Sequence, residues 1–373
     1  MKKTRVGILF GGKSAEHEVS LQSAKNIIDA IDKTKYELVL IGIDKEGHWR
    51  LTDSSRYLLN AQNPKLIKLN RAAGDSMAII PGSTENQLVA VSDRPIPEKV
   101  DVIFPILHGP FGEDGTIQGM LRLAGIPFVG AGVLGSAVGM DKDVMKRLLR
   151  DAKIPTARFL TLYRHNRDAV GFERAQELLG SPMFVKPANL GSSVGISKVR
   201  DGEEYSRALD IALTFDNKVL IEEAISGREI EVSVLGNENP IASIPGEIVT
   251  DPKHEFYSYD AKYIDENGAL LKIPAPLPKL LVGEFQKMAV QAFMTLECEG
   301  MARVDFFLVD NKKILVNELN TIPGFTKISM YPRLWEATGI SYSELINRLI
   351  QLALERDARD RKLRVSYDID KSG

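Results

Sequence analysis

Two apolar segments separated by an amphipathic stretch open the chain, and their order constrains the fold more than any other feature. Val6–Phe10 and Leu38–Ile43 have the composition of buried strands, and Ser20–Ile31 between them carries apolar residues at helical spacing. A strand–helix–strand unit places its two strands side by side in parallel, joined by a right-handed crossover. The order therefore predicts an α/β fold that begins with a parallel sheet.

The remainder of the chain alternates short strands and helices. Its 373 residues exceed what one hydrophobic core usually holds, so two or three domains are expected. Residues 52–97 are polar and poorly periodic, which indicates loops with minor elements. Further strands are predicted at 100–107, 182–185, 196–199, 218–222, 229–235, 302–309 and 313–319, and further helices at 117–123, 141–152, 203–214, 285–296 and 342–356, with a frayed tail beyond Asp357. The mixture predicts an α/β architecture with α+β parts.

Charge and cysteine content narrow the possible functions. The formal net charge is -2 and basic residues are interspersed with acidic ones, which argues against a nucleic-acid partner. Cys298 is the only cysteine, so it can form neither an internal disulfide nor a thiolate metal cage, and we interpret it as a small core residue. The basic start is followed by too short an apolar run for a signal peptide, and no segment approaches the ~18 apolar residues of a membrane span. We therefore expect a cytoplasmic protein without a membrane partner.

Gly7–Ser14 matches the phosphate-binding expression G-x-x-x-x-G-K-[ST], but we interpret the match as accidental. The residues between its two outer glycines form the predicted first strand, so only Gly11 and Gly12 remain to make a loop. Those glycines would then form a tight turn that lets a ligand approach the backbone. A P-loop nucleotide switch is the competing hypothesis, because Asp44 at the end of the second strand could supply its acidic partner.

A strand pair near the C-terminus carries the strongest chemical signal. Arg303 and Asp305 alternate on one strand. Glu318 and Asn320 alternate on the other, so that polar side chains share one face and apolar residues take the opposite face. Asp305, Glu318 and Asn320 offer hard oxygen atoms that suit Mg²⁺ bound with nucleotide phosphates, and Arg303 could reach a transferring phosphoryl group. An exposed hairpin with outward charges is the alternative, but carboxylates held together usually have a cation between them.

Two further segments are candidates for parts of the site, one as a phosphate-binding loop and the other as a lid. Gly191–Gly195, between two predicted strands, offers unhindered backbone N–H groups and the hydroxyls of Ser192 and Ser193 to phosphate oxygens, and Lys186 precedes it. Many hairpins have Gly-Ser tips, so this pattern alone does not distinguish a phosphate-binding loop from an ordinary hairpin turn. The polar segment 251–268 is too long for an ordinary loop and is predicted to be a lid.

Two loops of the N-terminal region also contain candidate site residues. His108–Gly115 follows a strand end, where ligands bind parallel sheets, although its Asp114 could instead cap the next helix. In the loop after the first strand, Glu16 or Glu18 could hold a substrate ammonium group. The alternative for this loop is a polar turn in which Ser20 caps the following helix.

Taken together, these motifs resemble those of the D-alanine–D-alanine ligase family, whose members have the ATP-grasp fold. His108–Gly119 matches the family's first signature (HGxxGEDGxIQG), and Gly300–Gly324 matches its second, from GxxRVD through ELNTxPG. The other matches, in the same order and over nearly the whole chain, are Gly11–Ser20, Met140–Lys142 and Gly191–Gly195. Several motifs in the right order are far more specific than any one of them.

The resemblance implies three domains around a cleft. They would be an N-terminal Rossmann-like domain over residues 1–130, a central domain over 131–221 and a C-terminal domain over 222–373, with ATP gripped between the second and the third. The lid at 251–268 would exclude water from the substrates. A homodimer is expected on the same ground.

The resemblance also implies residue roles, position by position. The residues that would bind the nucleotide are Lys142, Lys186, Ser192, Ser193, Glu222 (adenine amino group), Glu223, Ile225, Glu229 (ribose) and Lys262 (γ-phosphate). Those that would bind the substrates are Glu16 (the ammonium of the first D-alanine), His108, Arg303, and Ser329 with the Met330 backbone (the carboxylate of the second). Those assigned to catalysis are Glu16, Ser192, Tyr263, Arg303 and Gly324. Asp305, Glu318 and Asn320 would hold two Mg²⁺ ions, which Mn²⁺ could replace.

The reaction implied by the resemblance joins two D-alanine molecules into D-alanyl-D-alanine for peptidoglycan synthesis, and so for cell-wall biogenesis and cell shape. Transfer of the γ-phosphoryl group of ATP would convert one carboxylate into an acyl-phosphate, which the second amine attacks. The Lys262–Tyr263 pair favours an amine over the hydroxyl of D-lactate. A D-alanyl-D-lactate ligase, another ATP-grasp carboxylate–amine ligase and a ligand-binding module without catalysis are the alternatives.

Overall fold

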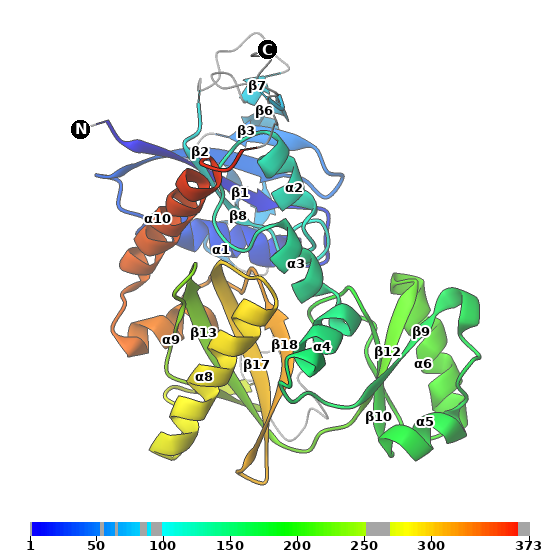
Figure 1. The fold of residues 1–373 in the computed structure, drawn as a ribbon. Coiled ribbons are helices and arrows are strands. Elements are labelled where there is room, and N and C mark those ends of the chain that lie inside the picture. Colours follow the sequence, from blue (N-terminus) through cyan, green and yellow to red (C-terminus); the bar gives the residue numbers. More distant parts are fainter. Residues whose placement is uncertain are drawn as a thin grey trace, which may run out of the picture.

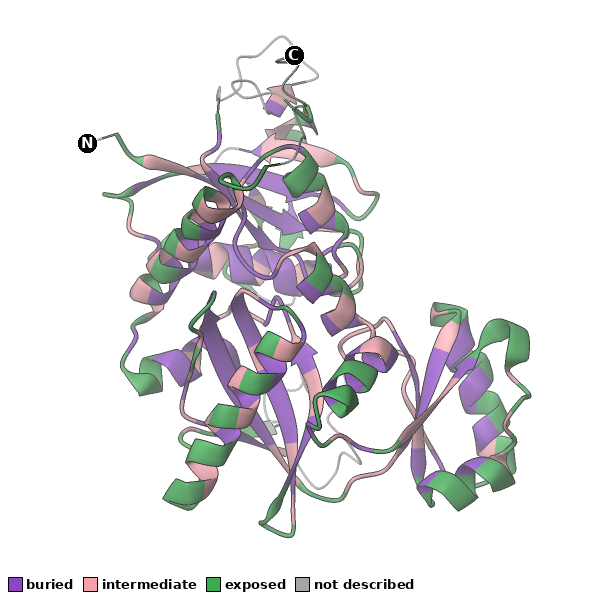
Figure 2. Ribbon diagram, viewed as in Figure 1, coloured by how far each residue is buried: buried purple, intermediate pink, exposed green. Residues whose placement is uncertain are grey.

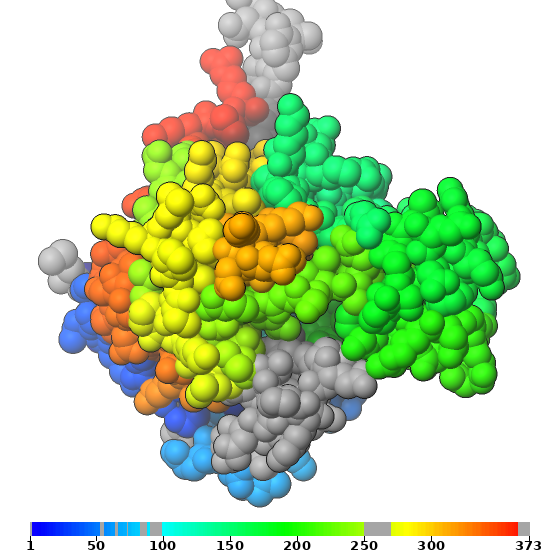
Figure 3. Space-filling model, turned by 90° about the horizontal axis from the view of Figure 1, so that it is seen from below, coloured from blue at the N-terminus to red at the C-terminus, as the bar shows by residue number. Residues whose placement is uncertain are grey.

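The computed structural model describes residues 2–52, 56–63, 66–82, 88–90, 99–250 and 269–364. Within these residues, three larger sheets each have their own helices, and a fourth sheet has two strands (Figure 1). In the space-filling view, the central sheet and its helices form a lobe beside the hairpin near residue 310 (Figure 3). In the part of the chain that is described, no helix is both long and apolar enough to cross a membrane.

The first sheet confirms the predicted parallel start. β1 (Thr4–Gly11) pairs in parallel with β2 (Tyr36–Ile43) on one side and β8 (Val102–Ile106) on the other, and α1 (His17–Ala30) makes the crossover. Gly7 lies inside β1 opposite Val39, which confirms that the residues between the outer glycines of the P-loop match form a strand. The strand takes up the residues that a phosphate loop would need.

The segment after β2 contributes more regular structure than the sequence predicts. It extends the first sheet with antiparallel strands and adds a two-stranded sheet beside it. The elements are β3 (Trp49–Thr52), β4 (Leu58–Leu59), β5 (Lys68–Leu69), the 3-10 turn Arg71–Ala73, β6 (Gly74–Ile79) and β7 (Leu88–Ala90). These strands are short and partly exposed, so their sequences lack the long apolar runs of β1 and β2.

The central sheet has the strand order β11-β10-β12-β9 and is antiparallel. Its strands are β9 (Phe159–Tyr163), β10 (Met183–Pro187), β11 (Ser197–Val199) and β12 (Lys218–Glu223), and its helices are α5 (Phe172–Leu179) and α6 (Gly202–Phe215), with a 3-10 turn at Arg164–Asn166. β10 and β11 pair on either side of Gly191–Gly195, which confirms the predicted hairpin. Asp201 caps α6 by accepting a hydrogen bond from the Glu204 N–H (2.8 Å).

The third sheet has the order β16-β15-β13-β17-β18, with β14 paired to β13. Its strands are β13 (Arg228–Gly236), β14 (Ile241–Ala242), β15 (Gly246–Thr250), β16 (Ala269–Lys272), β17 (Gly300–Val309) and β18 (Lys313–Asn320). Alternate residues of β13 and β17 face α8 (Lys279–Thr295) on one side and α9 (Met330–Thr338) on the other. Helix α8 covers one face, α9 covers part of the other, and β13 and β17 are buried along most of their length (Figure 2).

In this region the sequence predicts one turn correctly and one helix start wrongly. The turn at Asp310 and Asn311 is confirmed, and both residues have the positive φ of a tight turn. The predicted start of α8 at Phe285 is wrong, because the helix begins at Lys279, directly after Pro278. A proline directly before the first turn favours a helix start at that point. The first residues of the helix are mostly exposed, so they lack the apolar periodicity from which the helix was predicted.

Helices α2 (Thr116–Leu123), α3 (Val133–Met140) and α4 (Lys142–Asp151) run in succession from the first sheet toward the central one (Figure 1). Asp114 is not the N-cap of α2, which is Gly115 without a side-chain cap hydrogen bond; its carboxylate instead accepts hydrogen bonds from the N–H groups of Phe111 (2.8 Å) and Thr116 (2.9 Å). Met145 and Leu149 of α4 pack in the core of the third sheet. Helix α4, which lies on the path from the first sheet to the central one, is therefore also packed into the core of the third sheet.

Cys298 is buried against α3, which confirms its interpretation as a core residue. Burial raises the pKa of its thiol well above the ordinary value. A thiol kept neutral in an apolar setting is a poor nucleophile, so the residue serves packing.

Helix α10 (Tyr342–Asp360) returns from the third sheet to the first. Leu345, Ile346 and Leu349 pack in one core with residues of β1 and β8, so the last helix covers a face of the N-terminal sheet (Figure 1). The predicted division of the chain at residues 130 and 221 stays a prediction, and this core joins residues from both ends of the chain.

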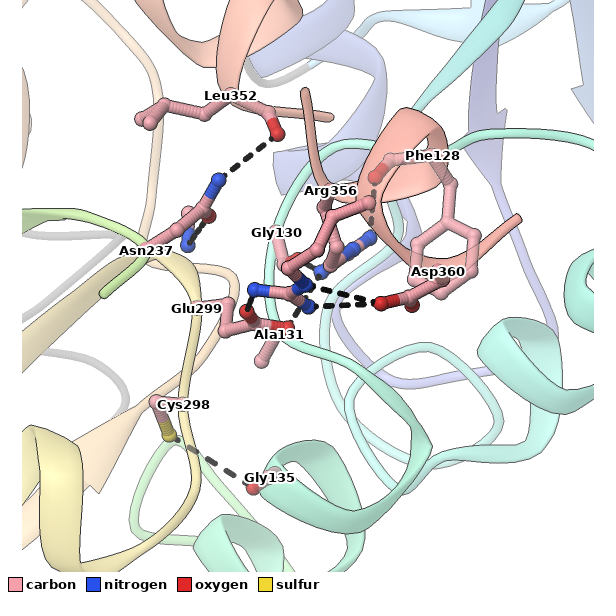
Figure 4. Close-up of polar contacts among 12 residues, drawn as sticks. Phe128, Gly130, Ala131, Gly135, Asn237, Cys298, Glu299, Leu352, Arg356 and Asp360 are labelled. Atoms are coloured by element: carbon pink, nitrogen blue, oxygen red, sulfur yellow. Dashed lines mark hydrogen bonds and ion pairs between the residues drawn. The ribbon is translucent and has the colours of Figure 1, made fainter. Parts of the chain in front are cut away.

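Arg356 fastens the end of α10. Its guanidinium donates hydrogen bonds to the carbonyl oxygens of Phe128 (2.6 Å) and Gly130 (2.5 Å), and it stacks 4.5 Å from the centre of the Phe128 ring (Figure 4). The predicted fraying beyond Asp357 is wrong over the next turn, because α10 continues to Asp360. Bonds to backbone carbonyls from a distant segment hold that turn, and nothing in the local sequence reports them.

Replacing Arg356 with methionine tests this attachment. Arg356→Met keeps an apolar stem but leaves two carbonyl oxygens without their donor, so the free energy of unfolding should fall by about 2 kcal/mol or more in urea denaturation. Arg348→Met on the same helix removes only an exposed pair with Glu344 and should change it by less than about 0.5 kcal/mol. Equal effects of the two substitutions would contradict the attachment.

Candidate active site

A cavity of about 500 Å³ lies between the central and third sheets, bordered by β10, β12, β13, β17, β18 and the start of α4. All predicted nucleotide-binding residues that the structure describes line it: Lys142, Lys186, Ser192, Ser193, Glu222, Glu223, Ile225 and Glu229. Asp305 and Glu318 line the same cavity, so the structure brings predicted phosphate and metal ligands together. Lys262, Tyr263 and the predicted lid lie outside the described residues.

Two buried lysines line this cavity. Asp141 caps α4 by accepting from the Val144 N–H (3.0 Å), which places Lys142 in the first turn. The Lys142 Nζ donates to the Leu190 carbonyl oxygen (2.7 Å) and lies 3.5 Å from a Glu318 carboxylate oxygen. It therefore ties α4 to both the glycine-rich loop and β18.

The second lysine, Lys186, donates from its Nζ to Glu222 Oε1 (2.7 Å). Burial alone would raise the pKa of Glu222, but Lys146 and Lys186 together lower it below its ordinary value. Glu222 is therefore a carboxylate. Cationic side chains at the wall of a cavity of this size suit the phosphates of a nucleotide.

The glycine-rich loop has an unusual backbone. Ser192 and Ser193 have φ of 52° and 59°, a left-handed conformation that costs non-glycine residues roughly 1 kcal/mol or more each. The loop ends at Gly195, where an added Cβ would lie 2.8 Å from the Phe215 ring and 2.9 Å from Pro187. Backbone held in such conformations is typical of ligand-binding loops.

Glu16 joins the first sheet to this loop. It lies between β1 and α1, is buried, and its carboxylate accepts a hydrogen bond from the Ser192 hydroxyl. Gly109 approaches it closely, because a Cβ at that position would lie 2.8 Å from Glu16 Oε2. The neighbouring candidate Glu18 instead pairs with Lys45 (2.6 Å), so Glu16 is the carboxylate that faces the loop.

Ser20 does not cap α1, and the alternative that assigned it that role is wrong. The helix begins earlier, at His17, so Ser20 lies within it. Its hydroxyl accepts from the Gly11 N–H (2.7 Å) and donates to the Ile106 carbonyl oxygen. Ser20 thus links the carboxyl ends of β1 and β8, where the loops of the site begin.

His108 is buried, and both of its ring nitrogens have partners. Nδ1 lies 3.0 Å from the Ile322 carbonyl oxygen and Nε2 lies 3.2 Å from the Ser23 hydroxyl. Burial lowers the pKa of His108, although Glu16 and the hydrogen bond to Ile322 oppose the shift. A carbonyl only accepts, so a neutral ring must carry its proton on Nδ1 and accept from Ser23 at Nε2. Ser23 in turn accepts from the Phe325 N–H (3.3 Å), so this histidine fixes the loop that follows β18.

Glu113 is a site residue that the sequence reasoning did not single out. Its carboxylate accepts from the backbone N–H groups of Gly109 (2.8 Å) and Ile322 (3.1 Å), and so it bridges the first and third sheets. Burial, and then the charge of Glu16, raise the pKa of Glu113 to about 8. The sequence feature that could have identified Glu113 is its position between the glycines of the HGxxGEDG motif.

Arg303 stands at the centre of the charged strand face. It lies beside Asp305, as predicted, and makes two hydrogen bonds of 2.7 Å to its carboxylate. Glu231 lies opposite Asp305 on β13 and 3.0 Å from the Arg303 guanidinium, a partner that the sequence reasoning missed. Burial would lower the pKa of Arg303, but these carboxylates raise it above its ordinary value.

The residues predicted to bind metal fit magnesium chemically. Asp305 lies directly opposite Glu318 across the β17–β18 pair, and the Asn320 amide donates to Asp305 Oδ2 (3.0 Å). Carboxylate and amide oxygens are hard donors of the kind Mg²⁺ prefers. The buried Asp44 and the exposed Glu46 and His48 also cluster, but Arg50 and Arg71 pair with the two acids.

The predicted carboxylate-binding residues lie at the N-terminus of α9. Ser329 occupies the N-cap position of this helix without a side-chain cap hydrogen bond, and its hydroxyl oxygen accepts instead from the Thr326 N–H (3.0 Å) in the preceding loop. Gly324 packs against it, since an added Cβ would lie 3.0 Å from Ser329 Oγ. The backbone N–H groups of a first helical turn, here beginning at Met330, favour an anion.

The raised pKa of Glu113 predicts a pH-dependent contribution to stability. The group takes up a proton below about pH 8 in the folded protein but only near its ordinary value of 4.5 in the unfolded chain. Its contribution is therefore complete below about pH 4.5 and is lost as pH rises to 8. The difference in unfolding free energy between the wild type and Glu113→Gln, from urea denaturation, should shrink by about 1 kcal/mol or more between pH 5 and pH 8. Glu284→Gln, an exposed control, should show a difference independent of pH, and the same flat profile for Glu113→Gln would contradict the assignment.

Comparisons with known proteins agree with this geometry. A family model described as the D-ala D-ala ligase N-terminus matches residues 5–131, and one described as the D-ala D-ala ligase C-terminus matches residues 148–351. A relative from Oceanobacillus iheyensis, named D-alanine–D-alanine ligase, is 57% identical over 364 residues, which cover 98% of this chain and 99% of the relative.

Solved structures extend the likeness to the fold. The D-alanine-D-alanine ligase from Coxiella burnetii superposes with a TM-score of 0.84 at 36% identity, covering 97% of each chain. The VanG D-Ala:D-Ser ligase from Enterococcus faecalis does so with a TM-score of 0.83 at 34% identity, covering 94% of this chain and all of the other. On the strength of both family models, the full-length relative and the shared fold, this chain belongs to the D-alanine–D-alanine ligase family of ATP-grasp enzymes.

Proposed function

We propose that this enzyme joins two D-alanine molecules into D-alanyl-D-alanine at the expense of ATP, for peptidoglycan synthesis. The observation that carries the proposal is the single cavity in which the predicted nucleotide ligands and the Asp305–Glu318 pair meet. Ser192 at its edge contacts Glu16, the predicted ligand of the first substrate's ammonium group. A nucleotide phosphate and a substrate carboxylate would thus approach each other at the glycine-rich loop.

The cations of the cavity would position and neutralise the phosphates. Lys142 and Lys186 would bind them from α4 and β10, and the backbone of Ser192 and Ser193 would cradle them. Asp305, Glu318 and Asn320 would hold Mg²⁺, which, when bound, neutralises charge on the transferring phosphoryl group. Phosphoryl transfer needs little else from the protein than such positioning and charge neutralisation.

The peptide bond would form next to Arg303. Glu16 would hold the ammonium of the first D-alanine, and the α9 N-terminus at Ser329 and Met330 would hold the carboxylate of the second. The Arg303 guanidinium, fixed by Asp305 and Glu231, would stabilise the oxyanion that develops when the amine attacks the acyl-phosphate, together with the backbone near Gly324. His108 and Glu113 would keep the loop after β18 in place during both steps.

The identity of the second substrate rests on sequence. The Lys262–Tyr263 pair favours an amine nucleophile, and D-lactate is the alternative retained from the sequence. The name of the related VanG enzyme adds D-serine to the substrates worth comparing. The homodimer remains a prediction from the family resemblance, and the cytoplasmic location remains a prediction from the sequence composition.

Phosphate release from ATP and Mg²⁺ tests the proposed reaction. D-alanine alone should release phosphate with an equal amount of D-alanyl-D-alanine, L-alanine should release none above background, and chelation of Mg²⁺ should stop the reaction. An amine must lose its proton before it attacks and a hydroxyl need not, so the dipeptide reaction should rise with pH when D-alanine competes with D-lactate. Release that does not depend on any amino acid, or a preference for D-lactate or D-serine at every pH, would contradict the proposed substrate.

A further inference from the structure

Lys146 is a fully buried lysine to which the proposed reaction assigns no role. It lies one turn after Lys142 on α4, and none of its surface is exposed to solvent. Its Nζ is 3.0 Å from Glu222 Oε2, whereas Lys186 donates to the other oxygen, Oε1 (2.7 Å). A single buried carboxylate thus lies between two ammonium groups, one inside the protein and one at the cavity.

The two lysines differ in what they can reach. Lys186 lines the cavity, so a nucleotide phosphate can become its partner. Lys146 lies behind the cavity wall and has only Glu222 within ion-pair distance among the described residues. Burial lowers the pKa of Lys146, and Glu222 opposes that shift. The inner pair can therefore persist while the outer one exchanges its partner.

A buried carboxylate that loses its only cation is strongly destabilised, because neither water nor another charge replaces it. If Glu222 had Lys186 alone, drawing Lys186 to a phosphate would leave such a carboxylate behind. With Lys146 in place, Glu222 keeps one ion pair throughout. The same exchange would leave Oε1 free to accept from the adenine amino group, the role predicted for Glu222.

We propose that Lys146 is a positioning residue, the permanent counter-ion of Glu222, which allows Lys186 to move to a nucleotide phosphate and Oε1 of Glu222 to receive the adenine. The inference rests on the proposed function, because it needs a nucleotide in this cavity. It extends that function to a residue that touches neither substrate nor metal. A purely structural tie between α4 and β12 is the competing explanation.

A double-mutant cycle on the full-length protein separates the two explanations. Lys146→Met removes the charge at nearly constant length, and Glu222→Gln removes the carboxylate charge. The dissociation constant of a non-hydrolysable ATP analogue with Mg²⁺ would be measured by calorimetry for the wild type, both single variants and the double variant. Arg147→Met, at the exposed neighbouring position on α4, is the matched control and should change affinity less than about twofold.

The expected result is a coupling between the two positions. Lys146→Met should weaken binding about tenfold or more when Glu222 is present but less than about threefold when position 222 is glutamine, since the neutral amide needs no counter-ion. The KM for D-alanine should stay within about twofold in Lys146→Met, because the substrate contacts are elsewhere. Equal losses of affinity in both backgrounds would overturn the inference, and a rise in the KM for D-alanine as large as the loss of nucleotide affinity would overturn it in favour of the structural tie.

Two controls keep the outcome decisive. If Lys146→Met does not fold, Lys146→Gln takes its place in the same cycle, since it also lacks the charge but can donate a hydrogen bond to Glu222. If the wild type does not bind the analogue, the proposed function fails and the inference fails with it. If the wild type binds but the two positions are uncoupled, the inference alone fails.

Discussion

Docking of α10 on the first sheet determines where the two sides of the active site stand. The helix leaves the third sheet, packs with β1 and β8 in one core, and is bonded by Arg356 to the backbone of Phe128 and Gly130. These contacts therefore hold the N-terminal sheet in position relative to β17 and β18. Only with that spacing fixed can His108 and Glu113 contact the backbone of Ile322.

Charge balance is the second constraint, and it explains the pairing of side chains around the cavity. Among the described residues, the cations proposed to act in the reaction each have a carboxylate partner: Lys142 has Glu318, Lys186 has Glu222, and Arg303 has Asp305 and Glu231. These pairs hold the ionised groups in place before substrates arrive, which keeps reorganisation small. Phosphates and Mg²⁺ would then exchange partners with groups that are already oriented, so binding and catalysis would use the same contacts.

The pattern of apolar and polar residues predicted those elements that are determined by a short stretch of sequence. The β17–β18 hairpin followed from residues alternating about the Asp310–Asn311 turn, and the β10–β11 hairpin from apolar runs on either side of a glycine-rich loop. The parallel start of the first sheet followed from its strand–helix–strand order. The family resemblance supplied the predicted nucleotide-binding residues, which line the cavity and which periodicity alone could not have assigned.

What the sequence did not reveal depends on contacts between distant segments. Glu231 becomes a partner of Arg303 only through the register of β13 with β17, and Lys146 becomes a partner of Glu222 only when α4 packs behind β12. The last turn of α10 is held by carbonyl groups more than two hundred residues away in sequence, such as that of Phe128. Backbone carbonyls are present at every residue, so no composition or spacing could have marked these two.

The most direct test of this account is a crystal structure of the protein with Mg²⁺ and a non-hydrolysable ATP analogue. We expect the nucleotide in the cavity between the central and third sheets, with its phosphates near Lys142 and Lys186 and metal on Asp305 and Glu318. We also expect the Lys146–Glu222 contact intact in that complex. A nucleotide bound at Gly7–Ser14, or in the separate cavity of about 410 Å³ lined by Arg150, Lys153 and Arg158, would contradict the central claim.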